Sequence, residues 1–162
     1  MSTGIENKDV VSSTNDFWPQ DKDGLLLNDA SLDKIPPKYL PLIEDIKQVY
    51  VDHSFGRLHS LYLFGSVPRG NARSGFSDID VLGVTKGKAE WVINKWTNLG
   101  KWKEPEGKRI LETYPIISNV VFDFEPLSFV MERKHFSWSA FLLSIGGVCI
   151  YGNDLIPELP RF

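Results

Sequence analysis

Apolar residues recur along the chain in two different periods, and each period predicts a different kind of element. From Tyr39 to Tyr50 they return every three or four positions, which predicts a helix with one buried face. Residues 58–65 and 80–85 are short and almost uniformly apolar, as is typical of strands buried on both faces. We therefore expect two central strands and a helix that packs against the same core.

Weaker patterns of both kinds follow in the second half of the chain. Residues 89–99 and 138–145 show helical spacing, and each stretch is followed by glycine. Residues 108–125 are interpreted as a hairpin or two successive strands, with Pro115 near the turn. Residues 148–154 predict a short strand and a turn.

The composition fits one domain with its own core. The chain has 162 residues, of which 42% are hydrophobic and 24% are charged. Residues 1–36 are polar and rich in turn-forming residues, so we expect an N-terminal arm on a single domain that spans residues 37–162.

Charge and cysteine content narrow the function and the compartment. The formal net charge of −3 argues against stable binding of duplex nucleic acid, which favours a basic surface. Cys149 is the single cysteine, so no internal disulfide can form. No stretch predicts a secretory leader or a membrane span, and we expect a cytoplasmic protein with no membrane partner.

A glycine and a serine end the first predicted strand. Gly65 permits a sharp turn, and residues 67–72 after it look like the start of a helix whose free backbone N–H groups suit a phosphate. Ser66 would add its hydroxyl and Arg69 a charged donor fork. By itself this pattern is weak evidence, because Gly-Ser turns are common at the ends of strands.

Three aspartates strengthen that interpretation. Asp78 and Asp80 are two residues apart at the start of the second strand, so their side chains face one side, where a divalent cation would relieve their repulsion. The alternative is a turn cap at Asp78 and a solvated strand edge at Asp80, which the following apolar run disfavours. If the strand of Asp123 lies alongside, three carboxylates converge opposite the Gly65–Ser66 turn, and two Mg²⁺ ions would bridge them to a triphosphate.

These residues together resemble the nucleotidyltransferase superfamily, which includes polymerase-β-like enzymes and aminoglycoside nucleotidyltransferases. The resemblance is greatest to the small members called minimal nucleotidyltransferases and covers roughly residues 40–152. It implies an α+β fold, with a short mixed β-sheet and helices packed against it. The segments that carry it are Gly65-Ser66, Arg69-Gly70, Ser77-Asp78-Ile79-Asp80 and the strand that bears Asp123.

The resemblance also implies an activity and a set of site residues. The activity is Mg²⁺-dependent transfer of a nucleoside monophosphate, with AMP from ATP the first choice, to a hydroxyl of a small molecule or a protein. Glu125 shares a face with Asp123 and stays a rival for the third acid. The expected catalytic metal ligands are Asp78, Asp80 and Asp123, and the expected nucleotide-binding residues are Gly65, Ser66 and Arg69.

Two departures from the family pattern leave the acceptor open. Residues 74–76 lengthen the loop before Asp78, and little follows Tyr151 where larger relatives carry a helical domain. The arm, a helical partner chain or a second copy would then complete the acceptor pocket. An alternative function follows, an antitoxin-like module that pairs with a helical HEPN-type toxin, with or without catalysis.

A modest basic cluster is interpreted as a solvated face, with phosphate contact as the alternative: Lys101, Lys103, Lys108 and Arg109.

Overall fold

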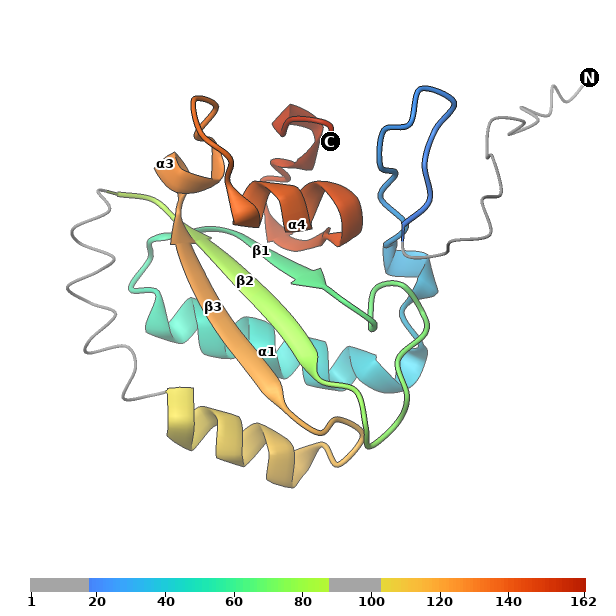
Figure 1. Cartoon of the computed structure of the whole chain (residues 1–162). Coiled ribbons are helices and arrows are strands. Elements are labelled where there is room, and N and C mark those ends of the chain that lie inside the picture. Colours follow the sequence, from blue (N-terminus) through green and yellow to red (C-terminus); the bar gives the residue numbers. More distant parts are fainter. Residues whose placement is uncertain (1–17, 88–102) are drawn as a thin grey trace, which may run out of the picture.

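A four-stranded mixed sheet forms the centre of the protein in the computed structural model, which describes residues 18–87 and 103–162 (Figure 1). The strand order is β3-β2-β1-β4; β1 runs antiparallel to β2 and β4, whereas β2 and β3 run parallel. The elements in chain order are η1 (Leu32–Lys34), η2 (Pro37–Tyr39), α1 (Leu40–His53), β1 (Leu58–Phe64), β2 (Ile79–Thr85), a helix over residues 103–113, β3 (Val120–Pro126), α3 (Leu127–Val130), α4 (Trp138–Gly146), β4 (Val148–Gly152) and η3 (Ile156–Glu158). The predicted α+β fold with a short mixed sheet is confirmed.

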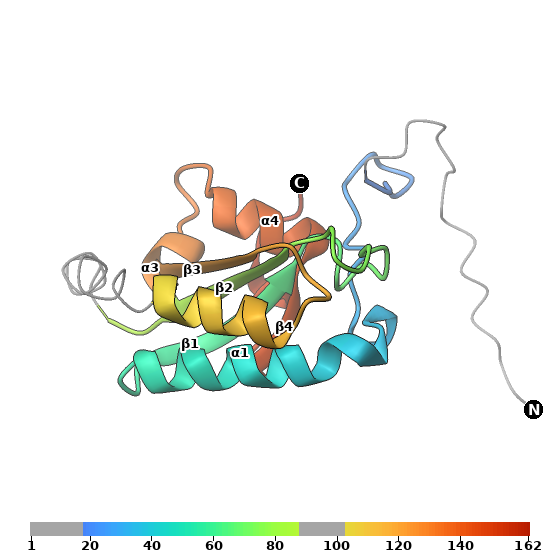
Figure 2. The ribbon, with the colours of Figure 1, turned by 90° about the horizontal axis from the view of Figure 1, so that it is seen from below.

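Helices cover both faces of this sheet. α1 and helix 103–113 lie on one face, and α3 and α4 lie on the other (Figures 1 and 2). Alternate strand residues supply the two cores: Leu61, Leu63 and Val81 pack toward α1, whereas Tyr62 and Leu82 pack toward α4. The predicted runs at residues 58–65 and 80–85 are therefore strands buried on both faces, as expected.

The helical predictions on either side of the sheet are also confirmed. α1 buries the face that the apolar spacing marks, including Leu42, Ile46 and Tyr50, and α4 buries Ala140 and Leu143. The predicted helix at residues 89–99 lies outside the described residues.

Two local predictions are wrong. Residues 103–113 form a helix, and only residues 120–126 of the proposed hairpin form a strand. Short apolar runs do not separate helix from strand by themselves, and here Ile110 is buried under the sheet on a helical face. Residues 66–70 are a turn and do not begin a regular helix.

Residues 18–36 run along the domain and contact its C-terminal end. Leu26 N–H donates to the carbonyl of Phe162, and Ser31 N–H donates to the carbonyl of Pro68. The division into an arm of residues 1–36 and a domain of residues 37–162 remains a prediction. Within residues 18–87 and 103–162, no helix has both the length and the apolar character needed to cross a membrane.

Candidate active site

The register of β2 against β3 places the predicted acids on one face of the sheet. Across this parallel pair, Asp80 lies opposite Val121 and Leu82 lies opposite Asp123. Asp80 and Asp123 therefore share the α4 face, one diagonal step apart, which corresponds to about 8 Å between their Cα atoms for regular strands. At the start of β2, Ile79 N–H donates to the carbonyl of Asn119, the residue before β3. Asp78 precedes Ile79 and therefore lies near the first residues of both strands.

The three carboxylates act on one another. Burial, and after it the negative charges of Asp78 and Asp123, raises the pKa of Asp80 to about 6. Asp78 itself is exposed, and the side chain of Asp123 is half exposed. Burial and the charges of Asp78 and Asp123 therefore all destabilise the ionised form of Asp80. A cation beside Asp80 would offset this destabilisation.

The turn after β1 lies directly against Asp80. Phe64 is the register partner of Asp80, and Gly65 follows it with φ +82°. A Cβ atom built on Gly65 would lie 2.6 Å from Oδ2 of Asp80. The sharp turn predicted from Gly65 is present, and the absence of a side chain there lets the carboxylate approach the turn.

Residues 66–70 form a single closed turn rather than a helix start. Asn71 N–H donates to the carbonyl of Ser66 and Gly70 N–H to that of Val67, and Gly70 has φ +78°, the pattern that commonly ends helices. The hydroxyl oxygen of Ser66 is buried, and it has no hydrogen-bond partner among the described residues. A buried hydroxyl without a partner costs free energy, which a ligand oxygen would recover.

Arg69 is held by the N-terminal segment. Its Nε lies 2.8 Å from Oδ1 of Asp29, close enough for an ion pair although the two atoms are not aligned as a hydrogen bond. The guanidinium also lies against Gly146 at the end of α4, where an added Cβ would come within 2.7 Å of it. Asp29 was not singled out in the sequence, because a carboxylate in a polar stretch carries no pattern that pairs it with Arg69.

The loop before Asp78 is fastened to the segment that leads into β3. Gly75 N–H donates to the carbonyl of Ile116, and Ser118 Oγ donates to that of Phe76. Ser77 closes the loop, since its hydroxyl accepts from Arg73 N–H at 2.8 Å. These bonds fix the position of Asp78 relative to β3.

Two residues beside Asp123 were not assigned to the site from the sequence. The hydroxyl of Tyr50, fully buried on α1, lies 2.8 Å from the carbonyl oxygen of Val81 and 3.0 Å from that of Asp123. Lys103 donates from Nζ to the carbonyl of Phe122, and the same Nζ lies 4.0 Å from Oδ1 of Asp123. Burial lowers the pKa of Lys103, and the Asp123 carboxylate opposes that change.

Glu125 lies two residues farther along the same face of β3. Its Oε1 accepts a 3.2 Å hydrogen bond from Ser139 Oγ in the first turn of α4. Burial raises the pKa of Glu125, Ser139 opposes this, and Asp123 adds to it. The register of β3 against β2 places Asp123 opposite Leu82 and Glu125 opposite Val84, so Asp123 lies nearer to Asp80 than Glu125 does.

The donor set suits a hard divalent cation. Carboxylate oxygens are the protein ligands that Mg²⁺ prefers, and Asp80 lies where added positive charge would stabilise its ionised form. As the side chains stand in residues 18–87 and 103–162, no three His, Cys, Asp or Glu side chains lie together as a ready metal-binding group. The chemistry of the residues fits Mg²⁺.

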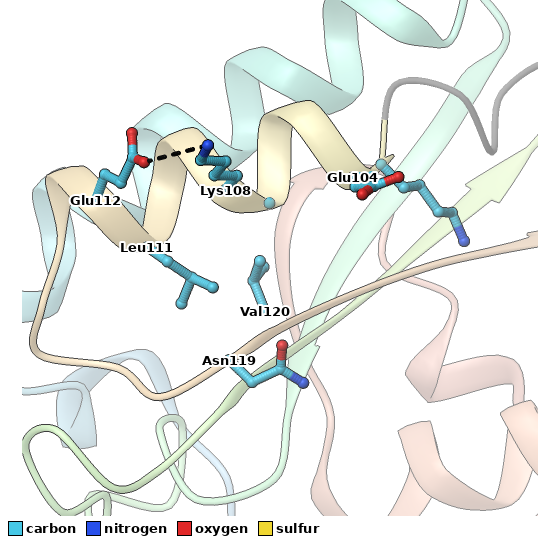
Figure 3. A pocket seen from close by; sticks show the side chains of 8 residues that line it. Glu104, Lys108, Leu111, Glu112, Asn119 and Val120 are labelled. Carbon is cyan, nitrogen blue, oxygen red and sulfur yellow. Dashed lines mark ion pairs between the residues drawn. The ribbon is translucent and has the colours of Figure 1, made fainter.

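A larger cavity of about 480 Å³ lies between helix 103–113 and the start of β3, and its wall includes Lys103, whose Nζ lies near Asp123 (Figure 3). Within this lining, Lys108 Nζ lies 3.9 Å from Oε1 of Glu112, an ion pair between two exposed side chains. Arg109 pairs with Asp45 and Glu106 on another side of the helix. The described members of the predicted basic cluster thus have different carboxylate neighbours, and their contact with phosphates remains a prediction.

Comparison with known proteins identifies the family. The model of the nucleotidyltransferase domain matches residues 43–134, more than half of the chain and a span that includes the Gly65 turn and all three aspartates. A solved structure from Sulfolobus solfataricus, assigned but not established as a nucleotidyltransferase, is 24% identical over 56% of this chain and 72% of that chain, with a TM-score of 0.36, too low to support a conclusion. No curated protein matches the chain. On the strength of the family match, the chain belongs to the nucleotidyltransferase domain family.

Proposed function

We propose that the protein transfers a nucleoside monophosphate, AMP from ATP, to a hydroxyl group of an acceptor. The acceptor oxygen forms a bond to the α-phosphorus, the bond from that phosphorus to the bridging oxygen breaks, and pyrophosphate leaves. Asp123 takes the proton of the hydroxyl. The family match supports nucleotidyl transfer in general, and the choice of ATP and of a hydroxyl acceptor is part of the proposal.

The observation that carries the proposal is the placement of Asp80 between the Gly65 turn and two other carboxylates. Its Oδ2 lies at the turn, while Asp78 and Asp123 both act on its ionisation. A triphosphate in the turn would therefore reach the residues that suit a divalent cation. Mg²⁺ bound by Asp78, Asp80 and Asp123 would supply charge stabilisation for the phosphates and lower the pKa of the acceptor hydroxyl.

Protein groups at the turn complete the nucleotide site. The unpartnered hydroxyl of Ser66 would donate to a phosphate oxygen, which satisfies a buried polar atom. Arg69 lies three residues farther on, held by Asp29, so a phosphate must share this guanidinium with a carboxylate. We propose that Gly65 and Ser66 hold the triphosphate and that Arg69 contributes at its edge.

The proposal is tested by incubating the full chain with α-labelled ATP, Mg²⁺ and cell extract. We expect label to appear on an acceptor, and we expect the Asp78→Asn/Asp80→Asn variant to transfer none. Glu112→Gln is the matched control, because Glu112 is an exposed carboxylate on the far face of the sheet. Equal labelling by the chain and by the double variant would refute nucleotidyl transfer at this site.

The same experiment separates the alternative function. If label appears on one small helical protein, the chain acts as the antitoxin-like module and modifies its partner. If a helical protein binds the chain without label, the module works by binding alone. Label on a small molecule favours an ordinary transferase.

A further inference from the structure

A second cavity opens on the α4 face of the sheet, beside the acids. It has a volume of about 250 Å³ and lies between α3 and the first turn of α4. Its wall combines two carboxylates with three aromatic rings: Glu125, Glu132, Phe129, Phe136 and Trp138. Nothing in the proposed chemistry of the three aspartates uses this cavity.

The end of β3 joins the cavity to the proposed site. Glu125, in its wall, follows Asp123 by two residues on the same face of the strand, a step of about 7 Å. A molecule seated in the cavity can therefore present a hydroxyl to Asp123 without passing through the nucleotide turn.

The aromatic rings of this cavity are unusually exposed. Phe129, Phe136 and Trp138 keep 49%, 64% and 62% of their surface accessible, and the rings of Phe136 and Trp138 lie 6.2 Å apart. Large exposed aromatic groups gathered in one place commonly mark a binding surface. Their faces carry partial negative charge, which attracts cations.

The charge of the lining selects among ligands. Lysine, arginine and histidine are absent from the described residues that line the cavity, and both ionisable groups are carboxylates. Such a lining repels phosphates and favours a cation. Among cations, a guanidinium group matches both features, because its planar fork pairs with carboxylates while its flat face stacks on aromatic rings, whereas an ammonium group keeps its hydration more strongly.

We infer that this cavity binds a guanidinium group of the acceptor, with Glu125 and Glu132 as its carboxylate partners and the rings of Phe129, Phe136 and Trp138 as its walls. This role as an acceptor site rests on the nucleotidyl transfer proposed above. Free arginine-like molecules and arginine side chains of proteins share this chemistry. In either case the accepting hydroxyl belongs to the same molecule and lies toward Asp123.

Binding is tested without ATP or Mg²⁺, so that its outcome does not depend on catalysis. The ¹⁵N-labelled full chain is titrated with butylguanidinium, butylammonium and the neutral butylurea while NMR follows the Trp138 indole and Ser139 amide signals. We expect butylguanidinium to bind about tenfold more tightly than butylurea, as charge-assisted hydrogen bonds allow. Equal affinity for butylguanidinium and butylurea, or tighter binding of butylammonium, would overturn the inference.

Variants locate the binding. Glu132→Gln should weaken butylguanidinium binding about threefold, as expected for an exposed carboxylate, and the half-buried Glu125→Gln about tenfold. Glu112→Gln should leave it unchanged, because Glu112 lines the other cavity. Binding that survives the double variant Glu125→Gln/Glu132→Gln would place the ligand elsewhere and overturn the inference.

Two further experiments distinguish a protein arginine from a small guanidinium compound, and a bound ligand from a second copy of the chain. A tetrapeptide Gly-Arg-Ser-Gly that binds more tightly than butylguanidinium, and loses this when citrulline replaces arginine, identifies a protein side chain as the source; the reverse order identifies a small molecule. A dimer in light scattering that Trp138→Ala dissociates would mean that a second copy covers the cavity, which overturns the inference.

Guanidinium binding without label transfer from ATP would refute the acceptor role and the proposed function together, whereas transfer without guanidinium binding would refute this inference alone.

Discussion

Oδ2 of Asp80 lies 2.6 Å from the point where a Cβ atom would stand on Gly65. The carboxylate expected to hold a cation and the turn expected to hold phosphates are therefore in contact, although fourteen positions of sequence separate Gly65 from Asp80. The contact exists because β1 and β2 pair antiparallel, with Phe64 opposite Asp80. A side chain at Gly65 would occupy the space of the carboxylate.

Gly65→Ala should reduce the rate of transfer strongly while it lowers the free energy of unfolding only slightly. The φ of +82° imposes a cost of about 1 kcal/mol on any residue with a Cβ, but the Asp80 side chain can rotate away from the new methyl group. That rotation moves the acid, so we expect transfer to fall about 100-fold, as displacements near 1 Å can cause. Urea unfolding and the labelling rate measure the two effects.

Gly24→Ala is the matched control for this substitution. Gly24 has the same φ of +82°, and an added Cβ there meets nothing within 4 Å. Its loss of stability should be similar, and its labelling rate should not change. If both variants lost transfer to the same degree, the cause would be backbone strain and not displacement of Asp80.

The identity of the third acid is decided by a pair of neutral substitutions. Asp123→Asn should lower the labelling rate about 100-fold or more, as expected for loss of a general base and cation ligand. Glu125→Gln should change the rate little when the acceptor carries no guanidinium group, because Ser139 holds this carboxylate toward α4. A larger loss in Glu125→Gln than in Asp123→Asn would exchange the roles of the two residues.

The sequence predicts the turn and the two neighbouring aspartates of the proposed site because their patterns are local. Gly65 lies at a strand end, and the spacing of Asp78 and Asp80 follows directly from strand geometry. The position of Asp123 depends on β3 pairing with β2. The sequence does not show that pairing, so the convergence of the three acids could be predicted only if the two strands were neighbours. The pairing of Arg69 with Asp29 and the hydroxyl contact of Tyr50 join segments far apart in sequence, and no local pattern marks them.

Helix 103–113 illustrates a different limit. Its apolar residues Ile110 and Leu111 are adjacent and are followed by Tyr114, a short pattern that fits a strand as well as a helical face. Packing beneath the sheet decides the outcome, and Lys103, the first described residue of this helix, reaches β3. A basic residue that looked like part of a solvated cluster thus lies beside the third acid.

The raised pKa of Asp80 predicts a specific dependence of stability on pH. Since its pKa is about 6 in the folded chain and 3.8 ordinarily, the folded state binds more protons between these values, and the free energy of unfolding falls as pH rises through that range. Asp80→Asn removes this fall. At pH 7 the variant should be more stable by on the order of 1 kcal/mol, after allowance for solvent screening, and near pH 4 the two should agree.

Urea midpoints of the chain and of Asp80→Asn at both pH values measure this difference. Millimolar Mg²⁺ should stabilise the chain at pH 7 more than it stabilises the variant, because the cation relieves the repulsion around Asp80. A variant that is less stable than the chain at pH 7 without Mg²⁺ would show that Asp80 contributes favourable contacts that outweigh the repulsion.

Tyr50 contacts the strands that carry the proposed catalytic acids from the opposite side of the sheet. Its hydroxyl lies within 3.0 Å of the carbonyl oxygens of Val81 and Asp123, one on each of the two strands that carry the acids. Tyr50→Phe should lower the free energy of unfolding by about 1 kcal/mol through loss of a buried hydrogen bond. It should also lower the labelling rate several-fold, since the backbone at Asp123 loses a fixed contact.

Tyr62→Phe provides the comparison. Tyr62 is equally buried, but its hydroxyl accepts from Leu155 N–H at 2.7 Å and donates to the carbonyl of Asn153, so these hydrogen bonds go to the segment after β4, whereas those of Tyr50 go to β2 and β3. Its removal should cost a similar amount of stability and leave the labelling rate unchanged. If the two variants are destabilised alike and only Tyr50→Phe transfers more slowly, the hydroxyl of Tyr50 positions the third acid; if both transfer at the rate of the unaltered chain, its role is confined to stability.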